Sequence, residues 1–475
     1  MDLHIIDLGI FIVYLAFMLG VGFYFMRKNK SEEDYYVGGR NMSAGHIGLS
    51  VVATDVGGGF SIGLGGLGFV MGISGSWMLF TGLVGAWLSA VLLIPKIYPI
   101  AKKHNFLTFP QSLAFHYNKK VALVAGIISL IGYVGFTSSQ ILAGAKLASA
   151  TFPSFSINDA VIVMGVIAVI YTVIGGIKAV IYTDTIQWII LMLGLICIGI
   201  PMGYNAIGGW EAISATLPSS FMSLTEISFI DLFNWFITIV PIWFVGMTLY
   251  QRIYACKDEK TAIKAWRIAG LFEWPIMAFM GIALGLFARV AFEQGMFTDI
   301  GYAPGTSMDP ELGLPLLLRT ILPVGLMGLM MSAYFSAIMS TADSCLMAAS
   351  GNFTTDILGF FRKKKALHEV RNSQIITLFI GVFAVLLATN MQNVLELMLY
   401  SYAFMVSGLL VPVVGMLVLK KPSSLAAIVS MILGGSTTLV LIISELKLPY
   451  ELDANFFGIS VATFSFVLIQ LIKRK

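Results

Sequence analysis

The chain has little charge, few cysteines and no pattern in its histidines. Only 11% of its 475 residues are charged, whereas 58% are hydrophobic, and a soluble protein of this length needs more charge to cover its surface. The three cysteines show neither a disulfide nor a metal-ligand spacing, and the five histidines form no metal motif. No nucleophile–base constellation can be recognised, so we do not expect an enzyme. The net charge of +4 gives no reason to expect a nucleic-acid partner.

Long apolar segments follow one another along the chain. A helix needs about 20 apolar residues to cross a bilayer, and this rule predicts an all-α polytopic membrane protein with 13 transmembrane helices. Asp2 precedes the first segment and a basic cluster follows it, the reverse of a signal peptide, so we expect this span to be retained. The segment 104–118 is too short to cross and is expected at the interface. The predicted spans are 5–26, 46–71, 75–99, 119–151, 156–176, 178–206, 227–251, 264–295, 314–348, 370–390, 393–419, 423–445 and 454–473.

Basic residues collect in alternate loops. With the N-terminus outside, 25 of the 29 lysines and arginines fall in loops predicted to face the cytoplasm, Arg252 among them. The positive-inside rule therefore predicts an outer N-terminus and a cytoplasmic C-terminus in the plasma membrane, or in the inner membrane of a bacterial cell. A wrong number of spans would scramble this alternation, so the bias also supports the number of spans.

The spans are expected to form one membrane domain, residues 1–475. Residues 1–45 hold the first span and an inner loop, and residues 420–475 hold the last two spans. Between them, residues 46–206 and 207–419 make two units of five spans each. Because an odd number of spans reverses the chain direction, two successive units must be inverted relative to each other.

The second span contains the run Ala53-Thr54-Asp55-Val56-Gly57-Gly58-Gly59-Phe60. A membrane helix normally excludes a carboxylate and keeps its backbone hydrogen-bonded, and a broken helix survives only where it is buried in protein or lines a polar cavity. An ionisable residue beside such a break indicates a functional site, and freed carbonyl groups at mid-membrane hold ions in secondary transporters. We therefore expect a functional break here; the alternative is a kinked helix with a structural aspartate.

The ninth span presents a polar face. The hydroxyl groups of Ser340 and Thr341 and the carbonyl of Ala337 can supply the hard oxygen ligands that sodium needs. Carbonyl groups of Ala53 and Val56, freed at the break in the second span, can complete the shell. Ordinary helix packing, with hydroxyl groups bonded one turn back, is the alternative. The residues that share this face at positions i, i+3, i+4 and i+7 are Ala337, Ser340, Thr341 and Ser344.

The sixth span carries Asp184 about two turns from its start, with Gln187 on the same face. A carboxylate at this depth must pair, bind a cation or take a proton. The alternative is a packing network with the backbone and Gln187. Gly175-Gly176 is expected to form a tight turn between the fifth and sixth spans.

Three motifs together resemble the sodium/solute symporter family, and they keep their order and spacing over nearly the whole chain. The resemblance implies a LeuT-like fold, a 5+5 inverted repeat with broken second and seventh helices. The motifs are Asp34-Tyr35-Tyr36-Val37-Gly38-Gly39-Arg40, Gly175-Gly176-x-x-Ala179-Val180-x-x-Thr183-Asp184-x-x-Gln187 and Met339-Ser340-Thr341-Ala342-Asp343-Ser344.

The resemblance also implies specific ion sites. Some family members carry a further cation site, which would use Asp184, Ser340 and Ser344 here. Asp55 matches a sodium-critical carboxylate of the sodium/proline symporters. Val56–Gly59 and Tyr250-Gln251-Arg252 are similar to the high-affinity choline transporters. Those transporters have an aromatic residue in place of Asp55, so choline is not carried over. The implied sodium ligands are Ala53, Val56, Ala337, Ser340 and Thr341.

The seventh span is expected to be the second broken helix, with its break near Pro241 and Gly246. Its aromatic residues would face the second span across a central cavity, and two residues of the fourth span match positions that line the pocket in family members. Ordinary packing is the alternative for each aromatic residue. The residues expected to contact the solute are Gly58, Phe60, Phe136, Gln140, Trp243, Met247 and Tyr250.

Some features are expected to be structural. Gly63-Leu64-Gly65-Gly66-Leu67-Gly68 fits G-x-G-x-x-G literally, but a dinucleotide fold needs a strand before this motif and a βαβ unit around it. Inside an apolar span, its small residues are expected to let helices pack closely. Charged residues expected to be structural or interfacial are Glu273, Arg289, Arg319 and Glu396.

These features predict a sodium-coupled symporter of a small polar organic solute, working by alternating access in the lipid bilayer. An amino acid such as proline is the first expectation for the solute, followed by an organic cation or a monocarboxylate. A proton-coupled transporter of the same fold and a membrane solute sensor are the alternatives. The absence of an attached signalling domain argues against the sensor.

Overall fold

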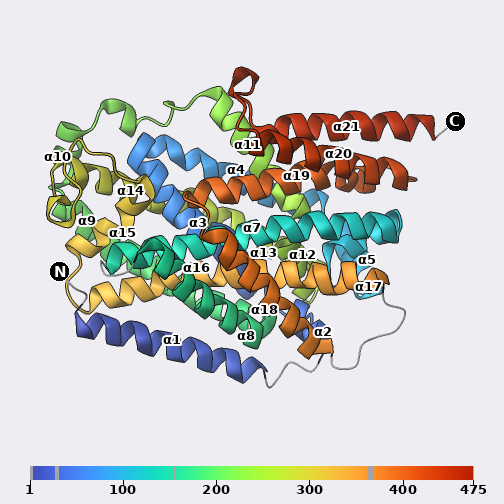
Figure 1. Cartoon of the computed structure of the whole chain (residues 1–475), viewed down its shortest axis with the longest axis horizontal. Coiled ribbons are helices and arrows are strands. Elements are labelled where there is room, and N and C mark those ends of the chain that lie inside the picture. Colours follow the sequence, from blue (N-terminus) through green and yellow to red (C-terminus); the bar gives the residue numbers. More distant parts are fainter. Residues whose placement is uncertain (1–3, 27–30, 153–155, 362–368, 474–475) are drawn as a thin grey trace.

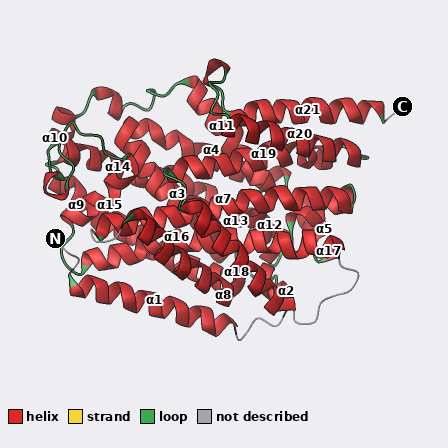
Figure 2. Cartoon of the chain, viewed as in Figure 1, coloured by secondary structure: helices red, strands yellow, loops and turns green. Residues whose placement is uncertain are grey.

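The computed structural model of the chain is helical almost throughout. It describes residues 4–26, 31–152, 156–361 and 369–473, and in these ranges there is no strand, only an isolated bridge between Met42 and Cys256. Most helices run along the long axis of the molecule, with the two termini at opposite ends (Figure 1). Short loops join them (Figure 2). Helices satisfy their own backbone hydrogen bonds, as hydrocarbon requires.

The first half of the chain extends to residue 228, and three short segments of other helical types interrupt it. They are η1 (Gly72–Ser76), η2 (Leu195–Gly199) and η3 (Ser219–Met222). The α-helices are α1 (Ile5–Met26), α2 (Glu32–Val37), α3 (Ala44–Met71), α4 (Trp77–Leu92), α5 (Ile94–His104), α6 (Phe109–His116), α7 (Lys119–Thr151), α8 (Ile157–Gly194), α9 (Ile200–Ala206) and α10 (Gly209–Thr216).

The second half contains the remaining helices. Its short segments are η4 (Phe272–Met277), η5 (Thr298–Ile300), η6 (Asn352–Leu358) and η7 (Pro449–Glu451). The α-helices are α11 (Phe229–Val245), α12 (Met247–Ala255), α13 (Glu259–Leu271), α14 (Ala278–Glu293), α15 (Pro310–Ile321), α16 (Leu326–Gly351), α17 (Gly359–Phe361), α18 (Glu369–Ala388), α19 (Val394–Val418), α20 (Ser424–Ile443) and α21 (Ala454–Ile472).

The predicted membrane character is confirmed. Among the described residues, nine helices are long and apolar enough to cross a membrane, or ten if the bent pair α11–α12 is one span. Large apolar side chains such as Phe379 on α18 and Phe464 on α21 are exposed, as lipid-facing side chains are. The total of 13 spans stays a prediction.

The predicted ninth span, 314–348, is wrong as one helix. α15 ends at Ile321, and α16 begins at Leu326. Pro323 follows Leu322, which is extended with ψ 131°, and Gly325 has a φ of 89°. A residue before proline avoids the helical conformation, and a positive φ suits glycine, so the chain turns between the two helices. The polar face 337–344 lies entirely on α16.

α8 covers the predicted span 156–176 and the first part of 178–206, and η2 and α9 complete the second span. The hydroxyl groups of Tyr171 and Thr183 are 3.1 Å apart, whereas twelve residues of a straight helix would separate them by about 18 Å. The chain therefore reverses within α8, and the segments before and after the reversal, Ile157–Ile174 and Val180–Ala206, are each apolar enough to cross; the second continues through η2 and α9. The predicted turn at Gly175-Gly176 falls outside the residues whose surroundings the structure describes.

α3 lies among α13, α14, α15 and α16 and packs against each of them. A Cβ added at Gly68 or Gly285 would overlap the backbone of the facing helix, at Ile282 and Gly65 respectively. The glycines that match G-x-G-x-x-G therefore let α3 approach α14 closely, in agreement with the packing role predicted for them.

Candidate functional site

The second predicted span is broken where its sequence indicated. Gly57 in α3 has φ 15° and ψ −158°, which is not helical. A Cβ at this position would overlap the side chain of Thr341 on α16. Glycine therefore allows α16 to reach the interrupted backbone of α3, and the predicted break is confirmed.

The seventh predicted span is also broken. α11 and α12 are bent by 42° across Gly246, whose ψ of 115° is extended. Pro241 stays inside α11, so the break falls at the glycine. Two discontinuous helices therefore contribute to the centre of the molecule.

Three of the five predicted sodium ligands meet at the break in α3. The Thr341 hydroxyl donates to the carbonyl of Ala53 at 3.0 Å and to that of Ala337 at 3.3 Å. Ser340 is buried, and its hydroxyl interacts with the carboxyl group of Asp184 on α8. Val56 lies outside the residues whose side chains the structure describes. The arrangement gathers uncharged oxygen atoms from two helices.

A guanidinium group lies where the further cation site was predicted. Arg252 on α12 is fully buried, and its Nη2 is 3.2 Å from Oδ2 of Asp184. The same nitrogen donates to the Ser344 hydroxyl at 2.8 Å. Arg252 also donates to the hydroxyl groups of Thr54 and Ser50 on α3, and Ser50 donates to Asp184 at 2.5 Å. The positive charge at this place is part of the protein.

The prediction that Arg252 belongs to an inner loop is therefore wrong. α12 continues beyond it to Ala255 inside the protein, whereas the predicted span ended at residue 251. Removing a guanidinium from water is costly, and a carboxylate with several hydrogen-bond acceptors offsets that cost. A count of basic residues cannot distinguish such a buried pair from a solvated loop. The motif Tyr250-Gln251-Arg252, which resembles the high-affinity choline transporters, was the sequence feature that could have indicated a special position for Arg252.

Asp55 faces a second acidic residue. It is buried just before the break in α3, and its carboxyl group meets that of Glu273 in η4, between α13 and α14. Tyr402 on α19 donates to Oδ1 of Asp55 at 3.3 Å. Glu273 is fully buried against Gly82 of α4, where a Cβ would overlap its Oε2. Sequence reasoning missed this pairing because Glu273 is far from Asp55 in the chain.

The residues predicted to contact the solute divide into separate groups. The ring of Phe136 packs edge-on against Tyr402, with centroids 5.0 Å apart, close to Asp55. Gly58 lies against Ile338 and Ala143. On the same helix as Phe136, Gln140 is buried and donates to Ser139 at 3.1 Å. Phe60 lies outside the described side chains.

The predicted solute-contact residues of α11 and α12 lie at two places. Trp243 packs against Trp266 at 6.3 Å and against Gly85 of α4. Met247 accepts a hydrogen bond from the amide of Phe109 on α6 at 3.2 Å. Tyr250 packs on the same phenylalanine, with ring centroids 4.8 Å apart. The structure therefore brings Met247 and Tyr250 to α6 and not to the group around Phe136.

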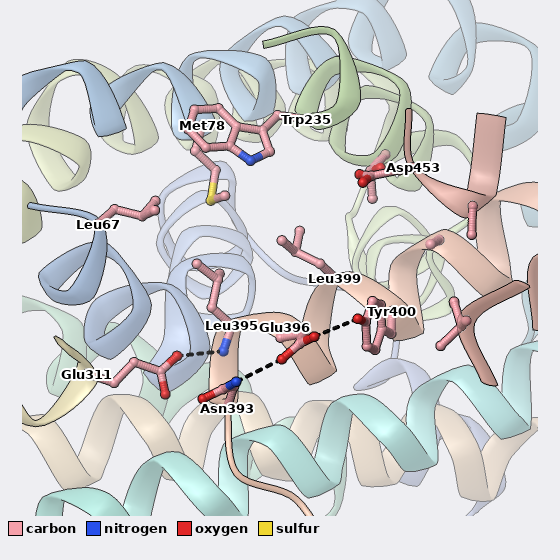
Figure 3. A pocket seen from close by; sticks show the side chains of 14 residues that line it. Leu67, Met78, Trp235, Glu311, Asn393, Leu395, Glu396, Leu399, Tyr400 and Asp453 are labelled. Atoms are coloured by element: carbon pink, nitrogen blue, oxygen red, sulfur yellow. Dashed lines mark hydrogen bonds between the residues drawn. The ribbon is translucent and has the colours of Figure 1, made fainter. Parts of the chain in front are cut away.

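A cavity of about 410 Å³ lies between α3, α4, α11, α15 and α19 (Figure 3). The described residues that line it include Glu311, Glu396 and Asp453 and no lysine or arginine. Glu396 accepts hydrogen bonds from Asn393 at 2.8 Å and Tyr400 at 2.5 Å. Burial, with a smaller effect of nearby Asp231, raises the pKa of Asp453 to about 6. The described lining thus carries three acidic side chains and no basic one.

An ionic cluster borders this cavity. Lys146 of α7 is buried, and its Nζ lies 2.5 Å from Oδ2 of Asp309 and 2.7 Å from Oε2 of Glu311. Glu311 also accepts from the amides of Val394 and Leu395, each at 2.9 Å, at the N-terminus of α19. A carboxylate is favourable at a helix N-terminus. The cluster therefore connects α7, α15 and α19 at one end of the molecule.

Sequence comparisons give a consistent picture. The model of the "Sodium:solute symporter family" matches residues 35–434. The sodium/proline symporter of Salmonella typhimurium is 27% identical over 445 residues, covering 90% of this chain and 86% of the relative. The osmoregulated proline transporter OpuE of Bacillus subtilis is 26% identical over 99% of this chain and 95% of its own length.

Solved structures share the fold. A Na+-coupled sialic acid symporter in a substrate-bound outward-open state has a TM-score of 0.79 and 22% sequence identity, covering 99% of this chain and 98% of that one. Mhp1, a nucleobase-cation-symport-1 family transporter, has a TM-score of 0.58 and 13% identity, over 93% of this chain and 94% of its own.

Proposed function

Since this chain belongs to the sodium:solute symporter family, we propose that it couples sodium movement to the uptake of a small polar organic solute by alternating access. It is a multi-pass membrane transporter and not an enzyme. The observation that carries the coupling proposal is the contact between the Thr341 hydroxyl of α16 and the Ala53 carbonyl at the break in α3. An ion at this place would join two helices that can separate when the transporter changes state.

For the sodium site we propose ligands from both helices. Carbonyl and hydroxyl oxygens are the ligands that hard cations prefer, and the Thr341 hydroxyl lies between the carbonyl groups of Ala53 and Ala337. The proposed ligands are Ala53, Val56, Ala337, Ser340 and Thr341.

At Asp184 and Ser344 we propose that Arg252 provides the positive charge in the state described here. Its guanidinium is bonded to both residues, and a sodium ion there would have to displace it. One sodium ion would then be transported in each cycle, and the Asp184 carboxylate would hold α8 to α12. A second sodium at Asp184 remains the competing proposal, and the two differ in the effect of removing the Ser344 hydroxyl.

The finer architecture also belongs to the proposal. We propose 13 spans, with residues 46–206 and 207–419 as two inverted units of five. The breaks at Gly57 and Gly246 support it, because each lies in the first spanning helix of its unit. The N-terminus would lie outside and the C-terminus in the cytoplasm, in the plasma membrane or a bacterial inner membrane. The clustered basic residues and the opposite ends of the termini (Figure 1) support this orientation.

The relatives point to the first solute to test. The sequence matches to proline transporters extend over most of this chain. An amino acid such as proline is therefore the first candidate, and an organic cation or a monocarboxylate follows.

Uptake by purified protein in liposomes tests the function. Labelled proline, choline and lactate are offered with an inward gradient of sodium, of potassium, or of protons alone. We expect sodium-stimulated uptake of one solute, with half-activation shifted to higher sodium in Thr341→Val. Thr151→Val is the matched control, because Thr151 is equally buried and bonds one turn back in α7. Uptake driven by protons and indifferent to sodium would contradict the proposal.

A further inference from the structure

The facing carboxyl groups of Asp55 and Glu273 lack a positive partner. Among the described residues, the two carboxyl groups hydrogen-bond to each other, and Asp55 also accepts from Tyr402, so neither acid meets a basic group. None of the ion pairs found among the described residues includes either acid. Arg252, a buried cation of the core, is already bonded to Asp184. Adjacent buried carboxyl groups without a counter-charge are unfavourable, so the arrangement suits a cationic ligand.

The surroundings of the pair are aromatic. Tyr402 and Phe136 pack edge to face beside Asp55. Trp243 contacts Gly85, one turn along α4 from the Gly82 that faces Glu273. Aromatic faces attract organic ammonium groups. Sodium is better matched by the uncharged carbonyl and hydroxyl oxygens at Thr341.

The lining of the acidic cavity includes residues that are close in the chain to those around this pair. Its wall includes Met78, one turn before Gly82 on α4, and Ala403, the neighbour of Tyr402 on α19. Glu396 points into it (Figure 3), and no ion pair found among the described residues includes that carboxylate. A cleft lined by one sign of charge concentrates ligands of the opposite sign. The charge of the cavity lining and that of the buried pair thus favour the same kind of ligand.

We propose that Asp55 and Glu273 bind the positively charged nitrogen of the transported solute, which makes the substrate an ammonium-bearing compound. This inference rests on the proposed function and narrows it: amines, quaternary ammonium compounds and amino acids fit, whereas sugars and monocarboxylates do not. The nitrogen joins α3 to the α13–α14 corner, while sodium joins α3 to α16. Binding of the two ligands therefore closes different helices onto the same broken segment.

Thermal unfolding of the purified full-length protein tests the inference. Proline and choline are the ammonium-bearing probes, lactate and glucose are the probes without ammonium, and each is titrated in sodium and in potassium. We expect proline or choline, and neither of the others, to raise the unfolding temperature in sodium. Glu273→Gln keeps the shape and should weaken the apparent affinity for that probe roughly tenfold or more. Stabilisation by sodium alone should be unchanged.

Two further variants separate binding from folding. Glu273→Asp retains the charge and should recover part of the affinity. Asp356→Asn removes another buried carboxylate, on η6, which is bonded to Thr108 and packs against α6 and α7, and should leave probe affinity unchanged. Stabilisation by lactate or glucose, no response to either ammonium probe, or unchanged affinity in Glu273→Gln would each overturn the inference. If Glu273→Gln removes stabilisation by sodium alone, the pair binds the metal ion and the inference is equally wrong.

The failure of the inference and that of the function are distinguishable. Sodium-stimulated lactate uptake in liposomes would overturn the ammonium site and leave symport standing. Absence of sodium stimulation for every probe, in unfolding and in uptake, would count against symport itself.

Discussion

Two places on α16, about one turn apart, present hydroxyl groups to neighbouring helices, and they differ in charge. At Thr341 the facing group is the Ala53 carbonyl, and the described contacts are between uncharged atoms. At Ser344 the facing groups are Arg252 and, through it, the buried carboxylate of Asp184. A face of small hydroxyl residues therefore does not define an ion site by itself. The formal charges that neighbouring helices bring decide whether the cation comes from solution or from the chain.

This difference in charge also gives the Thr341 and Ser344 places different capacities to bind and release an ion. A site of uncharged oxygens gains from an ion and can lose it again, since no buried charge is stranded when the ion leaves. A buried ion pair is different, because removing one partner exposes the other to the full cost of desolvation. We therefore assign exchange to the Thr341 site and structural cohesion to the Arg252 site, and variants can break or sharpen this division.

The largest effect is expected at the ion pair. Arg252→Met leaves the Asp184 carboxylate buried without a counter-charge, which should destabilise the protein by about 3–5 kcal/mol. The double variant Arg252→Met/Asp184→Asn should recover much of that loss. Thermal unfolding and the folded yield in detergent measure both. A double variant as unstable as the single one would show that the guanidinium acts through packing alone.

Gly57→Ala is expected to have the next largest effect. The new Cβ would overlap the Thr341 side chain, and overpacking of this kind costs about 1–3 kcal/mol. Because the strain falls on the proposed sodium site, sodium-stimulated uptake should drop more than protein yield does. Gly144→Ala is the control, since its Cβ would lie an ordinary 3.6 Å from its nearest neighbours. Equal losses of uptake in the two variants would remove the special role of Gly57.

Thr341→Val tests the uncharged site with less disturbance. Loss of one ligand oxygen, worth about 1.4 kcal/mol, should raise the sodium concentration for half-activation about tenfold. Solute affinity at low sodium should fall as well, because coupling between two binding sites is reciprocal. Binding measurements on purified protein, with Thr151→Val alongside, check both. If Thr341→Val and Ser340→Ala both leave sodium affinity unchanged, the face is packing and the site is misplaced.

The smallest effect is expected from Ser344→Ala. Its hydroxyl bonds to Arg252, so half-activation by sodium should change by less than about twofold, a fraction of a kcal/mol. The number of ions per cycle, measured from the reversal potential of transport in liposomes, should stay the same. A shift as large as that of Thr341→Val would instead place a sodium ion beside Asp184 and make the two sites alike.

The sequence by itself determined the features that depend on local chemistry. Apolar length fixed the membrane class, and the glycines at 57 and 246 marked both helix breaks. The spacing from Ala337 to Ser344 placed the polar face on one helix side. Each of these follows from the behaviour of a short segment in hydrocarbon, where an unpaired backbone group or a hydroxyl must find a partner.

Only the tertiary structure decided which charged groups meet. The sequence predicted that Arg252 is a loop residue and Glu273 a structural one. In the structure, Arg252 pairs with Asp184, and Glu273 faces Asp55. The tertiary structure also decided that Met247 and Tyr250 lie against α6, because the bend at Gly246 sets the direction of α12. The partner of a buried charge is chosen by helices distant in the chain, since desolvation penalises every charge that the fold leaves alone.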